Sequence, residues 1–89
     1  MRKLRSVTAL GNFTLDCVFE NGVQKIADIN PYLNSEVFMP LKNISLFSQV
    51  ENKLDYVSWL NDEVDLSADT LWHIGVEVIG KPPFLVAEV

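Results

Sequence analysis

One stretch decides the fold: WLNDEVDLSADTL, residues 59–71. It is typical of a strand that ends in an acidic turn and is followed by a capped helix. Ser67 is a favoured N-cap residue, because its hydroxyl can accept a hydrogen bond from an amide of the first turn. Leu66 and Leu71 fall at the two positions of a hydrophobic staple. We therefore predict a helix that begins after Ser67 and stops at Gly75.

The first third of the chain predicts an antiparallel meander. Strands are expected at residues 4–10, 13–20 and 23–28, where apolar and polar residues alternate. Gly11-Asn12 is expected to supply a two-residue turn, with the glycine at the position that needs positive φ. Asn21-Gly22 is expected to form a two-residue type I′ turn, because both residues tolerate the left-handed conformation.

Cys17 is the only cysteine, which excludes an internal disulfide framework and a multi-cysteine zinc site. In a simple two-residue register Cys17 faces Ile26, and Phe19 faces Gln24. No histidine or cluster of cations lies nearby in the sequence to lower the pKa of the thiol. We therefore predict that Cys17 is a small buried hydrophobic residue and not a reactive thiol.

Shorter elements are expected in the middle of the chain. Asn30 can cap a helical turn that starts with Pro31. Asn43 can cap a short helix at residues 44–48, and a hairpin is expected near residues 49–60, with Trp59 in the core. Together these patterns predict an α+β fold, with an antiparallel meander sheet of four to six strands and two or three short helices. The chain is expected to form a single domain, residues 1–89, with an apolar C-terminal extension at residues 76–89.

Charge is distributed unevenly along the chain. The formal net charge is −5, yet three of the seven cations lie within the first five residues. Between Glu51 and Glu77 there are seven carboxylates and one lysine, Lys53. Nucleic-acid phosphates require a basic surface, so direct DNA or RNA binding is not expected. A small basic protein is the partner that this charge favours.

Four carboxylates of the acidic stretch, those of Asp62, Glu63, Asp65 and Asp69, have no cation among them. Hard oxygen donors can bind calcium, but a calcium loop also needs a central glycine and a glutamate at its twelfth position. Both are missing, so we expect a solvated turn and no metal or other cofactor. Trp72, the next aromatic residue on the predicted helix, is of a type enriched in interfaces. These five residues form the candidate partner surface.

Catalytic chemistry finds no support in the sequence. His73 is the only histidine, and no serine, cysteine or second base accompanies it in a recognisable arrangement. The four glycines are scattered at turns and form no phosphate loop. The prediction is that the protein is not an enzyme. The basic N-terminus is not followed by the apolar run of a signal peptide, and no stretch has the length of a membrane span, so a cytoplasmic location is expected.

Several motifs occur together in a fixed order: Phe19 to Gly22, Asp28 to Pro31, Val37-Phe38 leading to Pro40-Leu41, Leu46-Phe47-x-x-Val50, Trp59-x-Asn61, and Asp65-Leu66-x-x-Asp69-x-Leu71. Together they resemble the bacterial family called domain of unknown function 2442, over about residues 3–74. The resemblance implies a small α+β protein with an antiparallel sheet and short helices.

Two functions from different classes follow from these observations. The resemblance implies relatives that carry a helix-turn-helix domain after this one, and others encoded beside small proteins that are candidates for toxin–antitoxin pairs. This chain is expected to have no room for a helix-turn-helix after the domain. The leading hypothesis is a non-enzymatic protein-interaction module, the acidic partner in a small toxin–antitoxin-like pair. The alternative is a regulatory domain that senses a small ligand in a groove between the sheet and the final helix, without a DNA-binding domain of its own.

The C-terminal extension predicts self-association. Residues 76–89 are mostly apolar, and Phe84 to Val86 have the composition of a strand. Pro82-Pro83 stiffens the connection and holds this segment extended. A core of this size has limited capacity to bury it, so we expect a homodimer formed through the extension. The alternative is a monomer in which the extension folds back as an edge strand of its own sheet.

Overall fold

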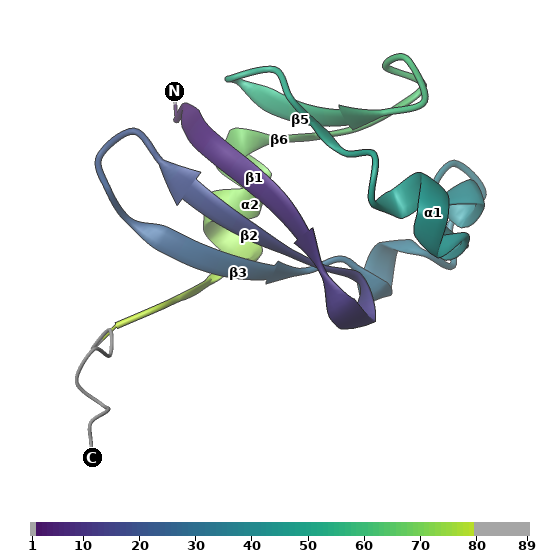
Figure 1. Ribbon diagram of the computed structural model, residues 1–89, viewed down its shortest axis with the longest axis horizontal. Helices are drawn as coiled ribbons and strands as arrows, with labels where there is room; N and C mark the ends of the chain where they lie inside the picture. The colour runs from purple at the N-terminus through teal and green to yellow at the C-terminus, as the bar shows by residue number, and fades with distance from the viewer. Residues whose placement is uncertain (1, 80–89) are drawn as a thin grey trace.

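The first sheet is the meander that the sequence predicts. The computed structural model describes residues 2–79 of the chain. Strands β1 (Leu4–Leu10), β2 (Thr14–Phe19) and β3 (Gln24–Asp28) pair antiparallel, in the order in which they follow along the chain (Figure 1). A short strand, β7 (Val76–Glu77), pairs antiparallel with the outer edge of β3. The first residues of the apolar extension therefore belong to the domain's own sheet, whereas the strand predicted at Phe84 to Val86 lies outside the described residues.

A second antiparallel sheet holds β4 (Glu51–Asn52), β5 (Tyr56–Trp59) and β6 (Val64–Ser67), in the order β4-β5-β6. The α+β class and the antiparallel pairing are confirmed. The strands divide between two sheets, however, and the strand β6 was not expected between the acidic turn and the helix. Its four residues alternate between buried and exposed, but the run is short enough to be mistaken for a loop.

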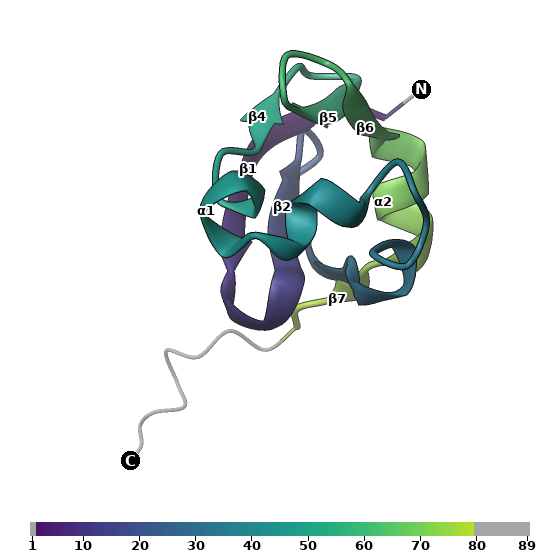
Figure 2. The same cartoon turned by 90° about the vertical axis from the view of Figure 1, so that its right-hand side faces the viewer.

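Side-chain caps fix both α-helices at the predicted places. In α1 (Ile44–Phe47) the Asn43 side chain accepts hydrogen bonds from the amides of Ser45 and Leu46, at 2.9 and 3.3 Å. In α2 (Ala68–Ile74) the Ser67 hydroxyl accepts from the Thr70 amide at 3.0 Å, and Gly75 ends the helix. The two helices lie on opposite sides of the molecule in Figure 2.

Within residues 2–79, three 3-10 segments connect these elements: Gly11–Phe13, Asn30–Tyr32 and Met39–Lys42. The predicted Asn30 cap is wrong, because Asn30 is the first residue of its segment and caps nothing. Its amide instead donates to the Asp28 carboxylate at 3.0 Å, and its side chain donates to the Asn12 carbonyl at 2.7 Å. The side chain that accepts a hydrogen bond from the first amide of this segment is therefore that of Asp28.

Both predicted two-residue turns are wrong by one residue. Cys17 pairs with Lys25, not Ile26, and Phe19 bonds to the Val23 carbonyl at 2.8 Å, so the loop after Phe19 has three residues. Its left-handed residue is Gly22 alone, at φ 92°, which is typical of a three-residue hairpin with a glycine bulge. In the first hairpin Leu10 pairs with Thr14, which again leaves three residues in the loop.

The positive φ angles of the first hairpin belong to Asn12 and Phe13, at 58° and 56°, and not to Gly11. Asn12 tolerates this conformation well. Phe13 is held there by packing, because its ring meets that of Phe47 edge to face at a centroid distance of 5.3 Å.

One hydrophobic core lies between the two sheets and the helices. Trp59 is only 1% exposed, stacks on Phe47 at 5.8 Å and donates its indole N–H to the Phe47 carbonyl at 2.8 Å. Its predicted place in the core is confirmed. Leu4 joins the two sheets: its amide donates to the Leu54 carbonyl at 2.8 Å. The core residues that come from the first sheet are Leu4, Leu15, Cys17, Phe19 and Ala27.

The two loop glycines make a matched test of the corrected turns. Replacing Gly22 by valine should lower the free energy of unfolding by about 1 kcal/mol or more, because a β-branched residue resists positive φ. Gly11 has open space around its Cα and does not need positive φ. Gly11→Ala should therefore be neutral or stabilise by up to about 1 kcal/mol. Urea denaturation measures the free energy of unfolding of both variants. A larger decrease for Gly11→Ala than for Gly22→Val would contradict the assignment of positive φ to Gly22 and not to Gly11.

Cys17 has the environment predicted for an inert thiol. The side chain is fully buried, and burial, followed by the charge of Asp16, raises its pKa from 9.0 to about 12. Between these pH values the thiol is deprotonated in the unfolded chain but protonated in the folded chain. Deprotonation therefore stabilises the unfolded state, and the free energy of unfolding falls as the pH rises above 9. Cys17→Ala has no thiol and lacks this pH dependence. The difference in the free energy of unfolding between wild type and Cys17→Ala, measured by urea denaturation, should therefore be smaller at pH 10 than at pH 7. An equal difference at both pH values would contradict the raised pKa.

Candidate partner surface

The tip of the β5–β6 hairpin carries the first two predicted residues, Asp62 and Glu63. Three consecutive residues there, Leu60, Asn61 and Asp62, have positive φ angles of 55°, 55° and 70°. The Glu63 amide closes the turn by donating to the Leu60 carbonyl at 3.1 Å. Asparagine and aspartate tolerate this conformation, but leucine does not. Leu60 is half-buried against the core, and this packing holds the tip in its strained shape.

The outer face of the second sheet carries Asp65 together with a carboxylate that the sequence analysis missed. Ser58 pairs with Asp65 on one side and with Glu51 on the other, so the three residues form a row across β4, β5 and β6. Side chains in one row point to the same face of a sheet. Ser58 is fully buried, and its hydroxyl has no hydrogen-bond partner. Glu51 could have been found only from the register of β4 against β5.

Asp62, Glu63, Asp65 and Glu51 are all exposed and together define the acidic hairpin surface. Glu51 lies 3.4 Å from the Lys53 ammonium, in a solvent-exposed pair. Asp62 accepts a long hydrogen bond of 3.4 Å from the Tyr56 hydroxyl. Within residues 2–79, no ion pair involves Asp62, Glu63 or Asp65. The surface is therefore negative and largely uncompensated.

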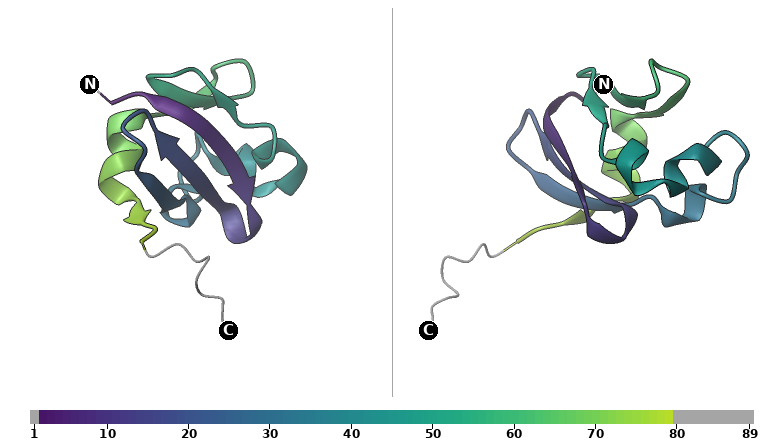
Figure 3. Two further views of the ribbon diagram at one scale, coloured as in Figure 1. Left: turned by 60° about the vertical axis from the view of Figure 1, so that its left-hand side comes forward. Right: turned by 45° about the vertical axis from the view of Figure 1, so that its right-hand side comes forward.

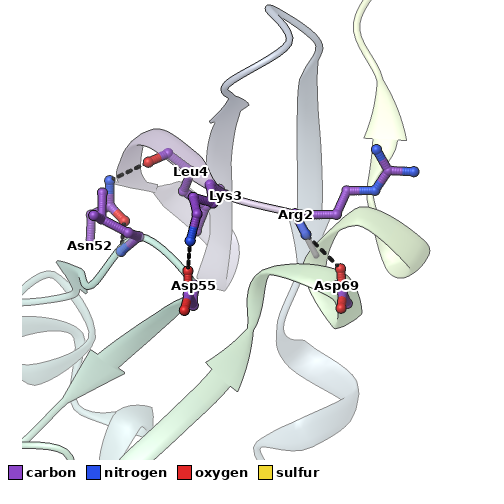
Figure 4. A network of polar contacts seen from close by, with 7 residues as sticks. Arg2, Lys3, Leu4, Asn52, Asp55 and Asp69 are labelled. Atoms are coloured by element: carbon purple, nitrogen blue, oxygen red, sulfur yellow. Dashed lines mark hydrogen bonds and ion pairs between the residues drawn. The ribbon is translucent and has the colours of Figure 1, made fainter.

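Asp69 has a different role, because it binds the N-terminal arm. The Arg2 amide donates to the Asp69 carboxylate at 3.1 Å, and the Lys3 ammonium pairs with Asp55 (Figure 4). The hydrogen bond that Lys3 donates to Asp55, followed by the charge of Asp55, raises the pKa of Lys3. One carboxylate of the acidic second half, that of Asp55, thus pairs with Lys3, and a second, that of Asp69, holds the backbone of Arg2.

Trp72 lies in the same N-terminal corner and not beside the hairpin tip. The Arg2 guanidinium lies 3.5 Å from the centre of the indole ring, and the Lys25 ammonium lies 4.0 Å from it. Lys25 also donates to the Trp72 carbonyl at 2.7 Å. Phe19 meets the ring edge to face at 5.0 Å. The structure therefore brings Asp62, Glu63 and Asp65 together and separates Asp69 and Trp72 from them.

The family assignment rests on a match that spans most of the described fold. Residues 4–77, from the start of β1 to the end of β7, match the model of the family described as "Protein of unknown function (DUF2442)". The chain belongs to this family. The resemblance found in the sequence is confirmed, and its extent now includes β7. Comparison with curated proteins and with solved structures gave no match.

Other kinds of site are limited in the described part of this DUF2442 protein. No group of three or more histidine, cysteine, aspartate or glutamate residues within residues 2–79 is arranged to hold a metal ion. A shallow pocket of about 200 Å³ lies at the N-terminal corner, lined by Arg2, Lys3, Phe19, Glu20 and Asn21. His73 is exposed on the last turn of α2. Among the described residues, no helix is long and apolar enough to cross a membrane.

The two tryptophans should differ in what their removal costs. Trp59→Ala empties a core site and should cost about 3–5 kcal/mol. Trp72 is half-buried and is held by two cations, each contact being worth about 0.5–1 kcal/mol at an exposed site. Trp72→Ala should therefore cost about 1–2 kcal/mol, and Trp72→Phe less, because phenylalanine keeps part of the cation–π contact. Urea denaturation followed by circular dichroism tests this order, and an equal cost for both alanine variants would contradict it.

Proposed function

We propose that this DUF2442 protein is a non-enzymatic protein-interaction module that binds a small basic protein through the acidic hairpin surface. The observation that carries the proposal is the group of exposed, uncompensated carboxylates at Asp62, Glu63 and Asp65. Complementary charge raises the rate at which two proteins associate and selects against acidic partners. In its most specific form, the proposal makes the chain the acidic partner in a toxin–antitoxin-like pair.

The shape of the hairpin tip supports the same proposal. Residues held at positive φ without glycine each cost roughly 1–3 kcal/mol, and such strain clusters at functional sites. Here three consecutive residues have positive φ, and the strain falls on Leu60, because Asn61 and Asp62 tolerate this conformation. A glycine would form this turn at lower cost. The tip instead keeps Asp62 and Glu63 exposed on a turn that is anchored to the core through Leu60.

The test is capture of a partner from the native host by the immobilised protein. The wild-type chain should retain a small basic protein, and rising salt should release it, because exposed charges are screened within a Debye length of about 8–10 Å. The double variant Asp62→Asn/Glu63→Gln should lose most of this capture, since it removes two charges from the tip without changing its size.

A matched control separates the surface from the net charge. Glu36→Lys changes the net charge by the same two units at an exposed loop position outside the acidic hairpin surface. This variant should capture the partner as the wild type does. Equal loss in both variants would assign the effect to net charge and sink the proposal for the hairpin, as would undiminished capture by the double variant.

The ligand-sensing alternative has one observation in its favour, the pocket at the N-terminal corner. Its volume of about 200 Å³ is below the range of about 300–1,000 Å³ common for ligand sites. The pocket lies beside the β2–β3 hairpin and not in the groove that the sequence predicted. A metabolite that co-purifies with the wild type and is lost on Arg2→Ala would favour this alternative over the interaction module.

A further inference from the structure

The outer face of the first sheet has an apolar corner. The register places Ile26 opposite Val76, and the Val78 amide donates to the Gln24 carbonyl at 2.9 Å. Val18 pairs with Gln24 from the other side. Since alternate residues of a strand share a face, Val18, Ile26, Val76 and Val78 all lie on this face and are neighbours across three strands. We call these four side chains the corner patch.

No element among residues 2–79 covers this patch. The helix α2 packs on the opposite face of the sheet, where Trp72 meets Phe19. In the left view of Figure 3 the second sheet and α1 lie behind the strands β1 to β3, and α2 lies beside them at the left (Figure 3). Val76 is 72% exposed. The corner patch therefore faces solvent in the described part of the chain.

The remainder of the face follows the ordinary rule for a solvated sheet, which is polar side chains outward. Its other positions, with the exception of Leu10, are polar, and its apolar side chains gather where β7 leaves the sheet. Contiguous exposed apolar side chains mark interaction sites more often than scattered ones do. The polar positions on this face are Ser6, Thr8, Thr14, Asp16, Gln24 and Asp28.

The chain itself carries a segment of suitable chemistry. Phe84, Leu85 and Val86 follow shortly after β7 in the sequence, outside the described residues. The pairing of β7 with β3 cannot be continued by this segment, because Val78 already lies opposite Gln24, the first residue of β3. Only the turn after Phe19 lies beyond that point. The segment must therefore find another apolar surface or remain in water.

The sequence of the connection favours contact with a second copy of the chain. Pro82-Pro83 restricts both prolines and the residue before them to extended conformations. At about 3.1 Å per residue, these three residues span roughly 9 Å. The corner patch includes Val76 of β7 and Val78 just after it, so an extended connection that begins at Lys81 favours contact between Phe84 and another copy over contact with the same chain. A connection of this length is compatible with residues 84–86 contacting the corner patch of a neighbouring copy.

We propose that residues 84–86 of one copy cover the corner patch of a second copy, and that the exchange is reciprocal in a twofold dimer. A twofold axis uses the same two surfaces twice and closes the assembly. Lys81, next to the prolines, is complementary in charge to Asp16 and Asp28 on the same face. The acidic hairpin surface lies on the second sheet, so the dimer leaves it free and does not depend on the proposed function.

The test measures the mass of the full chain in solution across the micromolar range, by light scattering or sedimentation. The wild type should be a dimer of the 10.1 kDa chain. Val76→Lys and a chain that ends at Ile79 should both be monomers. The matched control is Ile44→Lys, because Ile44 on α1 is 68% exposed, close to the 72% of Val76. This control should remain a dimer.

A mixing experiment separates exchange between copies from any other contact. Val76→Lys keeps its own C-terminal segment but has a damaged patch, whereas the truncated chain keeps its patch but lacks the segment. Each alone should be monomeric, and together they should form a heterodimer, which native mass spectrometry detects. A monomeric wild type would overturn the proposal, as would a dimer that survives either change. Failure of the mixed chains to associate would equally overturn it.

Discussion

The fold depends on the backbone contacts of Leu4, the residue at which the two sheets meet. Its amide donates to the Leu54 carbonyl and its carbonyl accepts from the Asn52 side chain at 3.0 Å, while its side chain is fully buried. Leu4 also pairs with Phe19 at the start of the first sheet. One residue therefore connects the meander to the β4–β5 end of the second sheet through its backbone and to the shared core through its side chain.

The same junction explains how an acidic chain distributes its charge. Once Leu4 is placed, the neighbouring Arg2 and Lys3 fall beside Asp69 and Asp55. The exposed Lys3–Asp55 ion pair is worth only about 0–1 kcal/mol, so it does not drive folding. This ion pair and the hydrogen bond from the Arg2 amide to Asp69 leave the Asp55 and Asp69 carboxylates less available to a partner protein. Three carboxylates without an ion pair in the described part of the chain, those of Asp62, Glu63 and Asp65, lie together at the β5–β6 hairpin, which is why that hairpin carries the proposed function.

Local signals in the sequence were sufficient for the helices but not for the pairing of strands. The caps at Asn43 and Ser67 satisfy amides within three residues, so sequence alone predicts them. The Asn21-Gly22 pair suits both a type I′ turn and a three-residue loop with a glycine bulge, and only the twist of the finished sheet decides between them. The separation of Asp69 and Trp72 from the acidic tip was beyond prediction for a similar reason. Both residues contact Arg2, 67 and 70 positions away, and no local pattern encodes such a contact.

The Leu4 junction also has a consequence for the order of events during synthesis. The partners of Leu4 lie about fifty residues further along the chain, so the first strand leaves the ribosome well before the segment that completes its surroundings. The β1–β2–β3 meander can pair early, because its hairpins are local. The apolar face of the meander then stays exposed to solvent until residues 52–71 have left the ribosome. During that interval the nascent chain exposes strand edges and apolar side chains that aggregate readily. This is the stage of synthesis at which a chaperone would bind the chain.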